Sequence, residues 1–402
     1  MEPMSKSIGE FALDIFKEIN SSNSDSNILY SPVSLAASLS LALLGSKGDT
    51  ASQIEKVLHV SNQGGATVSL ETHEAGSTWS GDECEQIASE SENVVPDVHN
   101  KLKALFDKLK TASDSELKIG NGLFTQLNFP ILKSYLESAQ TLYQANLKSV
   151  DFGKDKTREY INTWVEAETN GKIKNLFAPN SLDKNTSMIL VNAIYFKGKW
   201  IKTFKKDNTN NALFHVNENV KIPVPMMSQT ERFNYGFVEE MDAQFIELPY
   251  ENDDFSMFIF LPNKISGLQK VIEQITLELL MKSTDSKNMQ KTKLEIHIPR
   301  FKIEESYDLT SHLKNMGMLD AFSQKANLSG ISDVGLFVSK VIHKAFIEVN
   351  EEGTEASAAT GVVIQPKSAT RQFIVNHPFL CLIKHNATNT ILFCLKFCSP
   401  SL

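Results

Sequence analysis

The sequence predicts an α+β fold built as one domain over residues 1–402. Two observations indicate this class. Apolar residues recur at helical spacing in the first part of the chain, whereas apolar and alternating runs typical of strands dominate from about residue 118 onward. A length of 402 residues alone would allow two or three domains. No internal repeat and no linker rich in proline and glycine divides the chain, which favours a single domain.

The expected helices begin near the N-terminus. One apolar face with charged residues opposite predicts an amphipathic first helix, formed by Ile8, Phe11, Ala12, Ile15, Phe16 and Ile19. Thr50 is followed three residues later by Gln53, which predicts a capping box at the start of another helix. Helical spacing resumes at 98–109 on a helix that carries four lysines, Lys101, Lys103, Lys108 and Lys110. Between these helices, residues 61–93 lack periodicity and are rich in Gly, Ser, Thr and Glu, so we expect a long inserted acidic loop.

The strands follow in the second part of the chain. Residues 188–200, 245–250 and 255–262 are apolar runs bounded by proline, glycine or polar residues. Residues 293–304 alternate, with Leu294, Ile296 and Ile298 on one face. The stretch "YDLTSHLKNMGML" returns to a helical pattern, and residues 373–397 predict two strands around an asparagine-rich turn.

Composition excludes several classes of protein. Hydrophobic residues make up 41% of the chain and the formal net charge is -8, which argues against a general nucleic-acid binder, since such proteins need a basic face. No apolar run reaches the roughly 18 residues of a membrane span. The first 20 residues lack the uninterrupted apolar core of a secretion signal, so we expect no cleaved signal peptide.

The four cysteines do not form a disulfide scaffold. Cys381, Cys394 and Cys398 lie in apolar, strand-like sequence and are expected to be buried free thiols, whereas Cys84 lies in a polar stretch. A zinc site is the alternative, but no histidine cluster with ligand spacing accompanies the cysteines. We therefore expect no metal and no cofactor.

No sequence motif of an enzyme was found. The nucleophile elbow, the phosphate-binding loop, the HExxH zinc motif and the CxxC motif are missing from the sequence. His343 lies among apolar, strand-like neighbours, so a buried, hydrogen-bonded histidine is favoured over a catalytic one. The sequence is thus not expected to encode an enzyme.

Eight motifs resemble one known family, and seven of them follow one another in family order. The stretch "EEGTEASAA" at 351–359 resembles the reactive-loop hinge of the serpins, and "NILYSPVSLAASLSLALLGSKGDT", "YINTWVEAETNGKI", "LVNAIYFKGKW", "LPYENDDFSMFIFLP", "IPRFKIEESYDL" and "FIVNHPF" resemble serpin segments in family order. "ANLSGIS" also fits, with Asn327 where the family usually has aspartate, a difference expected to be structural only. The resemblance implies a serpin fold of three β-sheets with about nine helices and an exposed reactive-centre loop at about 351–372. It points to the ovalbumin-like type without a cleaved signal peptide.

The residues of the loop fit a segment that can become a strand. Every second residue from Thr354 is small at first and then apolar, and these residues would form one face of a strand. The residues between them would form the other face, which is more polar at its start. No proline occurs before Pro366, so each amide up to that point can donate to a sheet, and Gly353 gives freedom at the pivot. The hinge is expected to comprise Glu351, Gly353, Thr354, Ala356, Ser357, Ala358 and Ala359.

The resemblance implies suicide inhibition of a serine protease. The protease would cut the loop as an acyl-enzyme, and the freed hinge would insert into the main sheet with the protease attached. Family spacing from Gly353, and a second count back from Phe379, place the cut between Lys367 and Ser368. A lysine there suits a trypsin-like protease with an acidic specificity pocket. Arg371 is the other basic residue nearby.

The resemblance also implies structural roles and partners. Ser31, Ser34, Asn192 and His343 would form the shutter beneath the main sheet, and Trp200 would lie at the breach where the hinge enters. The four lysines at 101–110 correspond to a glycosaminoglycan-binding helix in antithrombin, but a solvated helix face is favoured here. We expect a monomer, outside the cell or at its surface, with the cytoplasm as the alternative. Asn20, Asn185 and Asn386 would be glycosylation acceptors on the secretory route.

The sequence leaves two other functions open. A non-inhibitory serpin could act as a carrier, chaperone or storage protein, although the small hinge residues favour inhibition. An enzyme of an unrelated class is the second alternative, and it would be revived if the bond between Lys367 and Ser368 were not cleaved.

Overall fold

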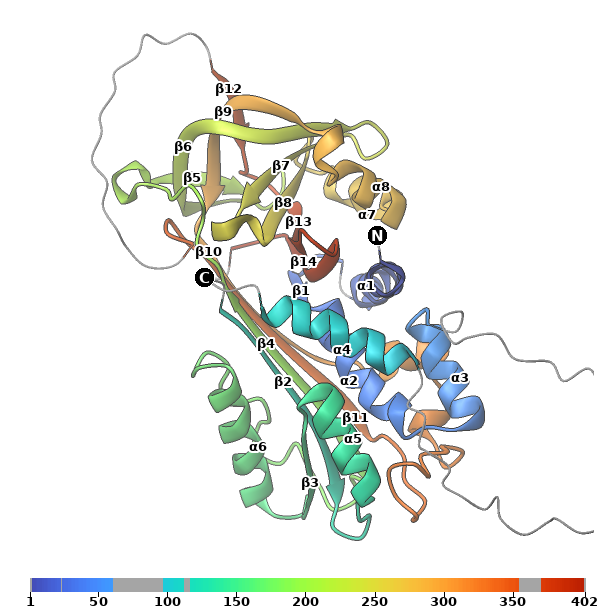
Figure 1. The fold of residues 1–402 in the computed structure, drawn as a ribbon. Coiled ribbons are helices and arrows are strands. Elements are labelled where there is room, and N and C mark those ends of the chain that lie inside the picture. Colours follow the sequence, from blue (N-terminus) through green and yellow to red (C-terminus); the bar gives the residue numbers. More distant parts are fainter. Residues whose placement is uncertain (1, 23, 61–96, 112–115, 354–369, 401–402) are drawn as a thin grey trace, which may run out of the picture.

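The structure is a computed structural model that describes residues 2–22, 24–60, 97–111, 116–353 and 370–400 (Figure 1). In these residues the helices are α1 (Pro3–Ser22), α2 (Pro32–Leu44), α3 (Gly48–Val57), α4 (Asp97–Lys110), α5 (Lys133–Tyr143), α6 (Asp155–Glu168), α7 (Leu268–Gln274), α8 (Leu277–Ser283) and α9 (Thr310–Asn315). The strands are β1 (Ile28–Tyr30), β2 (Glu116–Gln126), β3 (Asn146–Val150), β4 (Met188–Lys197), β5 (Asn210–His215), β6 (Lys221–Val238), β7 (Ala243–Pro249), β8 (Phe255–Pro262), β9 (Gln290–Pro299), β10 (Phe301–Asp308), β11 (Lys340–Val349), β12 (Arg371–Ile374), β13 (Phe379–His385) and β14 (Thr390–Phe397). The predicted nine helices are confirmed for this part of the chain. The predicted strands are also confirmed, except that residues 293–304 belong to two strands, β9 and β10, in different sheets, because the chain leaves one sheet for the other after Pro299.

A five-stranded sheet lies at the centre of the molecule, in the order β10-β11-β4-β2-β3. Its middle pair, β11 and β4, runs parallel, with residues 340–347 opposite 189–196. The strands on either side, β10 and β2, pair antiparallel with this pair. In Figure 1, α6 lies on one side of the sheet and α2 on the other. Both faces are therefore covered, which explains why nearly every residue of β4 is apolar and buried.

The other strands form a nine-stranded ladder in the order β1-β14-β13-β8-β7-β6-β9-β12, with β5 also paired to β6. The 18-residue strand β6 holds this ladder together. It pairs with β5 along its first six residues, with β9 along residues 226–235 and with β7 along its last five residues. The three expected sheets thus correspond to the five-stranded sheet and to the two parts of the ladder that meet at β6.

Helix α2 is buried on all sides. Its sequence, PVSLAASLSLALL, has no charged residue, and twelve of its side chains, from Pro32 to Leu43, are buried. A helix that is apolar all round belongs in a core and not at a surface. Ser31 caps the helix by accepting a hydrogen bond from the Ser34 amide at 3.3 Å, and Pro32 occupies the first turn. This cap fixes two of the expected shutter residues beneath β4.

The predicted capping box at Thr50 is wrong. Helix α3 begins at Gly48, and its N-cap, Lys47, makes no side-chain cap. The Thr50 hydroxyl instead accepts a hydrogen bond from the Asn327 amide at 3.0 Å, and Gln53 accepts from the amides of Leu319 and Asp320. These contacts join α3 to a segment more than 260 residues away, a role that local sequence does not reveal. They also give Asn327 the structural place that was expected of it.

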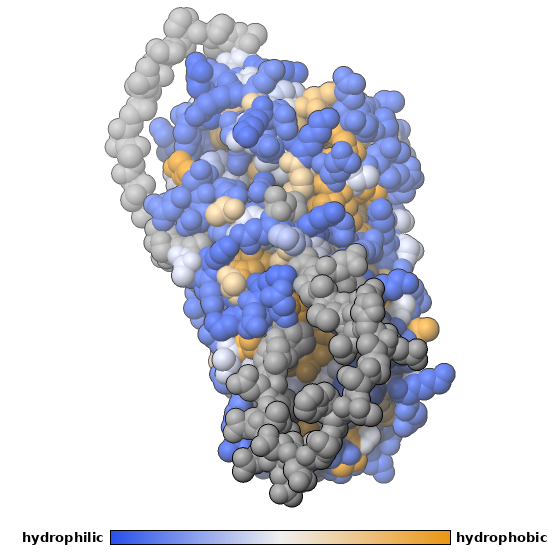
Figure 2. All heavy atoms as spheres, turned by 45° about the vertical axis from the view of Figure 1, so that its right-hand side comes forward, coloured by the Kyte–Doolittle hydropathy of each residue, from blue (hydrophilic) through white to orange (hydrophobic). Residues whose placement is uncertain are grey.

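The surface and the buried thiols agree with the composition. On the face shown in Figure 2, hydrophilic residues cover most of the visible described surface, and apolar residues gather in smaller patches between them. Cys381, Cys394 and Cys398 are free and buried, as predicted, and burial raises the pKa of each thiol. In the described part of the chain, no helix is long and apolar enough to span a bilayer. The inserted loop at 61–93 lies outside the described residues.

Candidate functional site

The candidate site is where the chain leaves the five-stranded sheet. Strand β11 ends at Val349, and the chain enters the other sheet at Arg371, the first residue of β12. Of the predicted hinge, Glu351 and Gly353 are described, whereas Thr354, Ala356, Ser357, Ala358 and Ala359 lie outside the described residues. Lys367 and Ser368 also lie outside them. The described part is the beginning of the hinge and the contacts that hold it.

Gly353 occupies a position that excludes a side chain. Its φ of +69° is in the left-handed region, which favours glycine. A Cβ atom there would lie 2.5 Å from the Gly198 carbonyl oxygen and 2.7 Å from Lys199 Cα. Because these obstacles are backbone atoms, they cannot move as a flexible side chain would. The hinge thus begins in close backbone contact with the segment that follows β4.

Glu351 is a buried carboxylate with two side-chain partners. Its Oε1 accepts a hydrogen bond from the Thr209 hydroxyl at 2.8 Å and lies 3.4 Å from Arg300 Nη1. Its carbonyl oxygen accepts a hydrogen bond from the Phe204 amide at 2.7 Å. A buried charge needs such partners because it has lost its water. Glu351 therefore fixes the hinge to the segment after β4 and to the end of β9.

The next contacts join Asn350 and Glu352 to Trp200. The indole Nε1 of Trp200 donates to the Asn350 carbonyl at 2.9 Å, and its backbone amide donates to the Glu352 carbonyl at 3.3 Å. Trp200 stacks on Tyr250 at a ring distance of 4.4 Å. The Glu352 carboxylate lies 2.6 Å from Lys206 Nζ, and this hydrogen bond raises the pKa of Lys206. The structure thus places Trp200 directly against the beginning of the hinge.

The four expected shutter residues meet under the centre of the sheet. Asn192 of β4 and His343 of β11 are register partners, and all four side chains, including those of Ser31 and Ser34, are fully buried. His343 Nε2 accepts a hydrogen bond from the Ser31 amide at 3.1 Å, so its proton lies on Nδ1, which donates to Asn192 Oδ1 at 2.5 Å. Burial lowers the pKa of His343 to about 3 and keeps the ring neutral.

Asn192 extends this network to a third strand. Its Nδ2 donates to the Ser34 hydroxyl at 2.5 Å and to Asn121 Oδ1 of β2 at 2.7 Å. The network therefore connects α2 with β2, β4 and β11, three neighbouring strands of the sheet. A polar network of this kind, fully hydrogen-bonded, fixes the strands in one arrangement.

Comparison with known proteins decides the family. A family model described as Serpin (serine protease inhibitor) matches residues 6–400. The chain belongs to the serpin family. Serpin B4 of Homo sapiens is 42% identical to this serpin over 407 residues, and the match covers 100% of both chains. The crystal structure of uncleaved ovalbumin is similar, with a TM-score of 0.85 and 34% identity over 99% of this chain and 100% of that chain. Human thyroxine-binding globulin is similar with a TM-score of 0.83 and 26% identity over 99% of each chain.

The lysines of helix α4 in this serpin are neutralised by neighbours. Lys101 pairs with Asp97, Lys103 lies 2.7 Å from Asp107, and Lys108 lies 2.6 Å from Glu2. Lys110 donates to Gln144 Oε1 at 2.6 Å. Since three of these four cations have a carboxylate partner, the helix presents less free positive charge than its sequence suggests. This geometry favours the solvated helix face over a glycosaminoglycan site.

Arg371, the alternative cleavage position in this serpin, is part of a strand. It pairs with Leu294 in the parallel ladder between β12 and β9. Its guanidinium lies 4.7 Å from the centre of the Tyr235 ring, a cation–π contact. A protease needs an extended, accessible bond, and a backbone held in a ladder must first leave its partner strand. The structure therefore disfavours cleavage after Arg371.

Sequence reasoning missed several residues of this site, among them Asn121, Thr209 and Arg300. Asn121 had a local signal, because it is an amide between Gly120 and Gly122 in an otherwise strand-like run. Thr209 and Arg300 had none. They lie 142 and 51 residues from Glu351 along the chain, and only the fold brings them to its carboxylate.

Proposed function

We propose that this serpin inhibits a trypsin-like serine protease by loop cleavage and insertion of the cut loop into the five-stranded sheet. The observation that carries this proposal is the parallel pairing of β11 with β4, directly beside the start of the loop. A segment that continues from β11 can fold back along it as an antiparallel neighbour. It would then lie between β11 and β4.

Insertion would convert one strand pair into two. The parallel β11–β4 ladder would be replaced by antiparallel ladders from the loop to β11 and from the loop to β4. Parallel pairing is slightly less stable per residue than antiparallel pairing, and the number of ladders also rises. The alternating small and apolar set from Thr354 to Ile364 supplies an inward face that this position can bury. The uncut protein would therefore be metastable.

The contacts of the hinge and of the shutter would supply the kinetic barrier to insertion of the loop. The 2.5 Å hydrogen bond from His343 to Asn192 crosses the β11–β4 boundary, so an entering strand must break it. The bonds from Trp200 and Phe204 to the hinge carbonyls must also break before residues after Val349 can follow β11 into the sheet. We infer that these contacts delay insertion until the loop is cut.

The chemistry would run through the bond between Lys367 and Ser368. The serine of the protease attacks the Lys367 carbonyl carbon, the peptide bond breaks, and the new amino group of Ser368 leaves with the C-terminal fragment. The acyl-enzyme keeps Lys367 attached to the protease. Fourteen inserted residues at about 3.3 Å each would carry it on the order of 45 Å, before water can hydrolyse the ester. Lysine at this position supports a protease with an acidic specificity pocket.

Further parts of the proposal concern organisation and place of action. We propose that residues 1–402 form one serpin domain, and the larger of two core clusters in the described residues supports this, because it includes both Met4 and Cys398. We also propose a monomer that acts outside the cell or at its surface, with the cytoplasm as the alternative compartment. Similarity to thyroxine-binding globulin keeps a non-inhibitory carrier as the second candidate function.

Incubation with trypsin, followed by denaturing gel electrophoresis and mass spectrometry, tests the proposal. We expect a covalent complex that survives denaturant and a released peptide that begins at Ser368. A peptide that begins at Gln372 would move the reactive bond to Arg371. Cleavage without any complex would favour the non-inhibitory candidate. Lys367→Leu should shift inhibition towards chymotrypsin-like enzymes, while Lys340→Leu, outside the loop, should leave the preference unchanged.

A further inference from the structure

The sequence contains two Asn-Gly pairs, Asn121–Gly122 and Asn170–Gly171, and the fold gives them opposite surroundings. In such a pair the backbone nitrogen of glycine can attack the asparagine side chain with little steric hindrance, because glycine has no Cβ atom. Asn121 is buried in β2, and its Oδ1 accepts a hydrogen bond from Asn192 at 2.7 Å. Asn170 is exposed and lies just after the end of α6. Any difference in reactivity between the two pairs therefore comes from the fold.

Asn170 closes the end of α6 in a Schellman motif. The φ of Asn170 is +50° and that of Gly171 is +73°, both in the left-handed region. The Gly171 amide donates to the Glu166 carbonyl at 2.7 Å. The Asn170 amide donates to the Ala167 carbonyl at 3.3 Å, which completes the motif. The Asn170 side chain donates to the carboxylate of Glu116 at the start of β2, so this residue joins the helix end to the sheet.

The position at the helix end leaves the second pair open to reaction. Among the described residues, a Cβ atom at Gly171 would meet no atom within 4 Å. Helix ends fray at a low free-energy cost, and fraying here releases the Gly171 amide from Glu166. Gly122, by contrast, lies in the ladder between β3 and β4, opposite Asn146 and Val191. The first pair can therefore rearrange only when the centre of the sheet opens.

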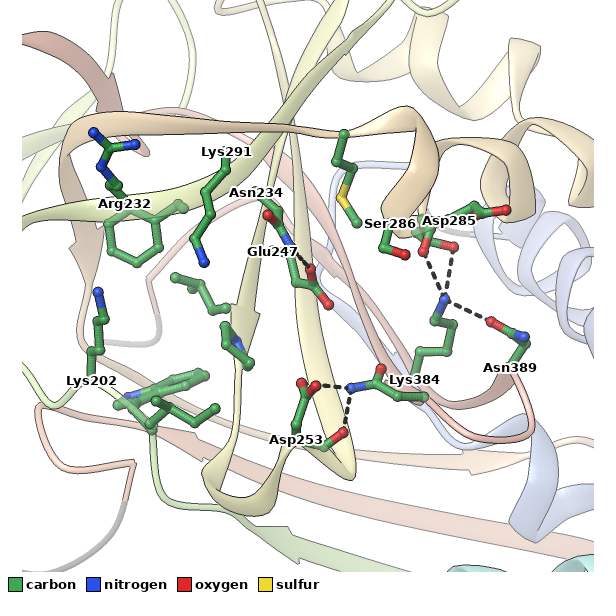
Figure 3. Close-up of a pocket in the computed structure, with 18 of the residues that line it drawn as sticks. Lys202, Arg232, Asn234, Glu247, Asp253, Asp285, Ser286, Lys291, Lys384 and Asn389 are labelled. Atoms are coloured by element: carbon green, nitrogen blue, oxygen red, sulfur yellow. Dashed lines mark hydrogen bonds between the residues drawn. The ribbon is translucent and has the colours of Figure 1, made fainter.

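Other asparagines with a left-handed backbone lack this combination. Asn389 has a φ of +56°, but its Oδ1 accepts a hydrogen bond from Lys384 Nζ at 3.0 Å, as Figure 3 shows. The residue after it is Thr390, whose β-branched side chain crowds the attacking nitrogen. A residue with a side chain also follows the remaining such asparagines of the described chain, Asn175, Asn180 and Asn252. Asn170 is thus distinguished by its conformation together with its neighbour.

We propose that Asn170 is a site of spontaneous deamidation, in which the Gly171 nitrogen attacks the side-chain amide carbon of Asn170 and water completes the reaction. The Gly171 nitrogen loses its proton to a base in the solvent and forms a bond to Cγ. The side-chain nitrogen takes a proton from the solvent and leaves as ammonia. Water then opens the cyclic succinimide at either of its carbonyls. The product carries a new carboxylate, as aspartate or as isoaspartate, where the amide was.

Either product would weaken the junction between α6 and β2. Aspartate would replace the hydrogen bond to Glu116 by repulsion between two carboxylates. It would also place negative charge at the C-terminal end of a helix, where the helix dipole disfavours it. Isoaspartate would lengthen the backbone by one methylene and disrupt the Schellman motif.

This junction covers the sheet beside the shutter. A Cβ atom at Gly120 would lie 3.1 Å from Glu168 Cβ, and one at Gly122 would lie 2.8 Å from Trp164 Cη2, so the last turns of α6 lie directly on β2. Asn121 of the shutter network lies between these two glycines. Loosening the end of α6 therefore uncovers the backbone of β2 next to the shutter, and we expect a deamidated chain to melt at a lower temperature.

Ageing of the intact chain at mildly alkaline pH, followed by denaturation, digestion with trypsin and mass spectrometry, tests the site. The two pairs fall in separate tryptic peptides, residues 119–133 and 159–172. We expect conversion at Asn170 to be at least about a hundredfold faster than at Asn121, because core strands open far less often than helix ends. Isoaspartate should be present, since direct hydrolysis of the amide gives aspartate alone. In concentrated urea the two rates should converge.

Equal rates at Asn121 and Asn170 in the folded chain, or conversion without isoaspartate, would overturn the proposal. So would a folded chain in which Asn170 stays intact while both pairs convert in urea. Asn170→Gly is the control variant, because glycine suits the left-handed backbone and removes the reactive amide. Ageing should lower the melting temperature of the unmodified chain and leave that of Asn170→Gly unchanged.

Asn170→Asp reproduces one of the two products without ageing. It should lower the melting temperature by roughly 2 °C, and Glu116→Gln in the same chain should restore part of this loss, because the repulsion between carboxylates is then absent. An equal loss with and without Glu116→Gln would show that the contact with β2 does not carry the effect.

Discussion

Asn192 and His343 face each other across the parallel boundary between β4 and β11, and a 2.5 Å hydrogen bond joins their side chains. Burial lowers the pKa of His343 to about 3, so the folded protein holds the ring neutral while an unfolded chain protonates it near pH 6.5. The stabilisation from this group is complete above pH 6.5. It is lost as pH falls towards 3, because protons then bind the unfolded state more strongly.

We therefore expect acid to destabilise the uncut protein partly through this histidine. Between pH 7.5 and pH 5 its contribution should fall by about 2 kcal/mol. His343→Gln, which keeps a hydrogen-bonding amide, should be less stable at pH 7.5 but should lose less on acidification. Urea unfolding at both pH values measures the difference. The same loss in both proteins would show that His343 does not carry the pH dependence.

The left-handed backbone of Gly353 gives a second expectation. Gly353→Ala forces a Cβ against Gly198 and Trp200 and strains a φ of +69°, so it should destabilise the uncut protein by at least about 1 kcal/mol. Gly335→Ala is the control, because a Cβ at Gly335 would meet no atom within 4 Å. The midpoint of the first transition in urea unfolding measures the stability of both variants. Equal behaviour of the two variants would contradict the close contact at the hinge.

The alternation of side chains along the loop predicts which face of the hinge must enter the sheet. Thr354→Arg would place a charge on the inward set and slow insertion, because a buried unpaired charge costs several kcal/mol. The bond after Lys367 would still be cut at the original rate. The variant should therefore become a substrate, with many more loops cleaved for each protease molecule inhibited. Glu355→Arg, in the outward-facing set, should reduce inhibition far less. An equal loss of inhibition in both variants would refute the interpretation that only one face of the loop enters the sheet.

Cleavage of the loop should raise thermal stability. A nick in an ordinary protein lowers stability, but here the cut would let residues 354–364 add a central strand. Roughly ten new backbone hydrogen bonds would contribute several kcal/mol, which corresponds to a rise in melting temperature of roughly 10 °C or more. Calorimetry before and after complete cleavage measures this. A lower or unchanged temperature would favour the non-inhibitory candidate.

The four glycosylation sequons, at Asn20, Asn185, Asn327 and Asn386, differ sharply in accessibility. Asn20 is buried, and its Oδ1 accepts a hydrogen bond from Lys396 at 2.6 Å, so a glycan there is incompatible with this fold. Asn386 donates its amide to Ser256 at 2.9 Å and to the Asp253 carbonyl at 2.8 Å. Asn185 and Asn327 are exposed. If the chain is secreted from a cell that glycosylates, Asn185→Gln and Asn327→Gln together should abolish the mobility shift on endoglycosidase treatment, whereas Asn20→Gln should not.

The sequence alone determined the elements whose pattern is local. The period of Ile8, Phe11 and Ile15 predicted α1, the alternation of Leu294 and Ile296 predicted β9, and the asparagine-rich turn predicted the hairpin of β13 and β14. Motifs in family order gave the fold and the group of Ser31, Ser34, Asn192 and His343. These signals are readable because a helix or strand is specified by neighbours a few residues apart.

Only the tertiary structure decided which distant groups meet. The sequence predicted a local helix cap from Thr50 and Gln53, but in the structure both side chains bind a segment more than 260 residues away. The partners of Glu351 and the contact of Lys108 with Glu2 depend on how segments far apart in sequence are placed. Strand register and helix packing fix these contacts through the burial of the whole core, and no window of the sequence contains that information.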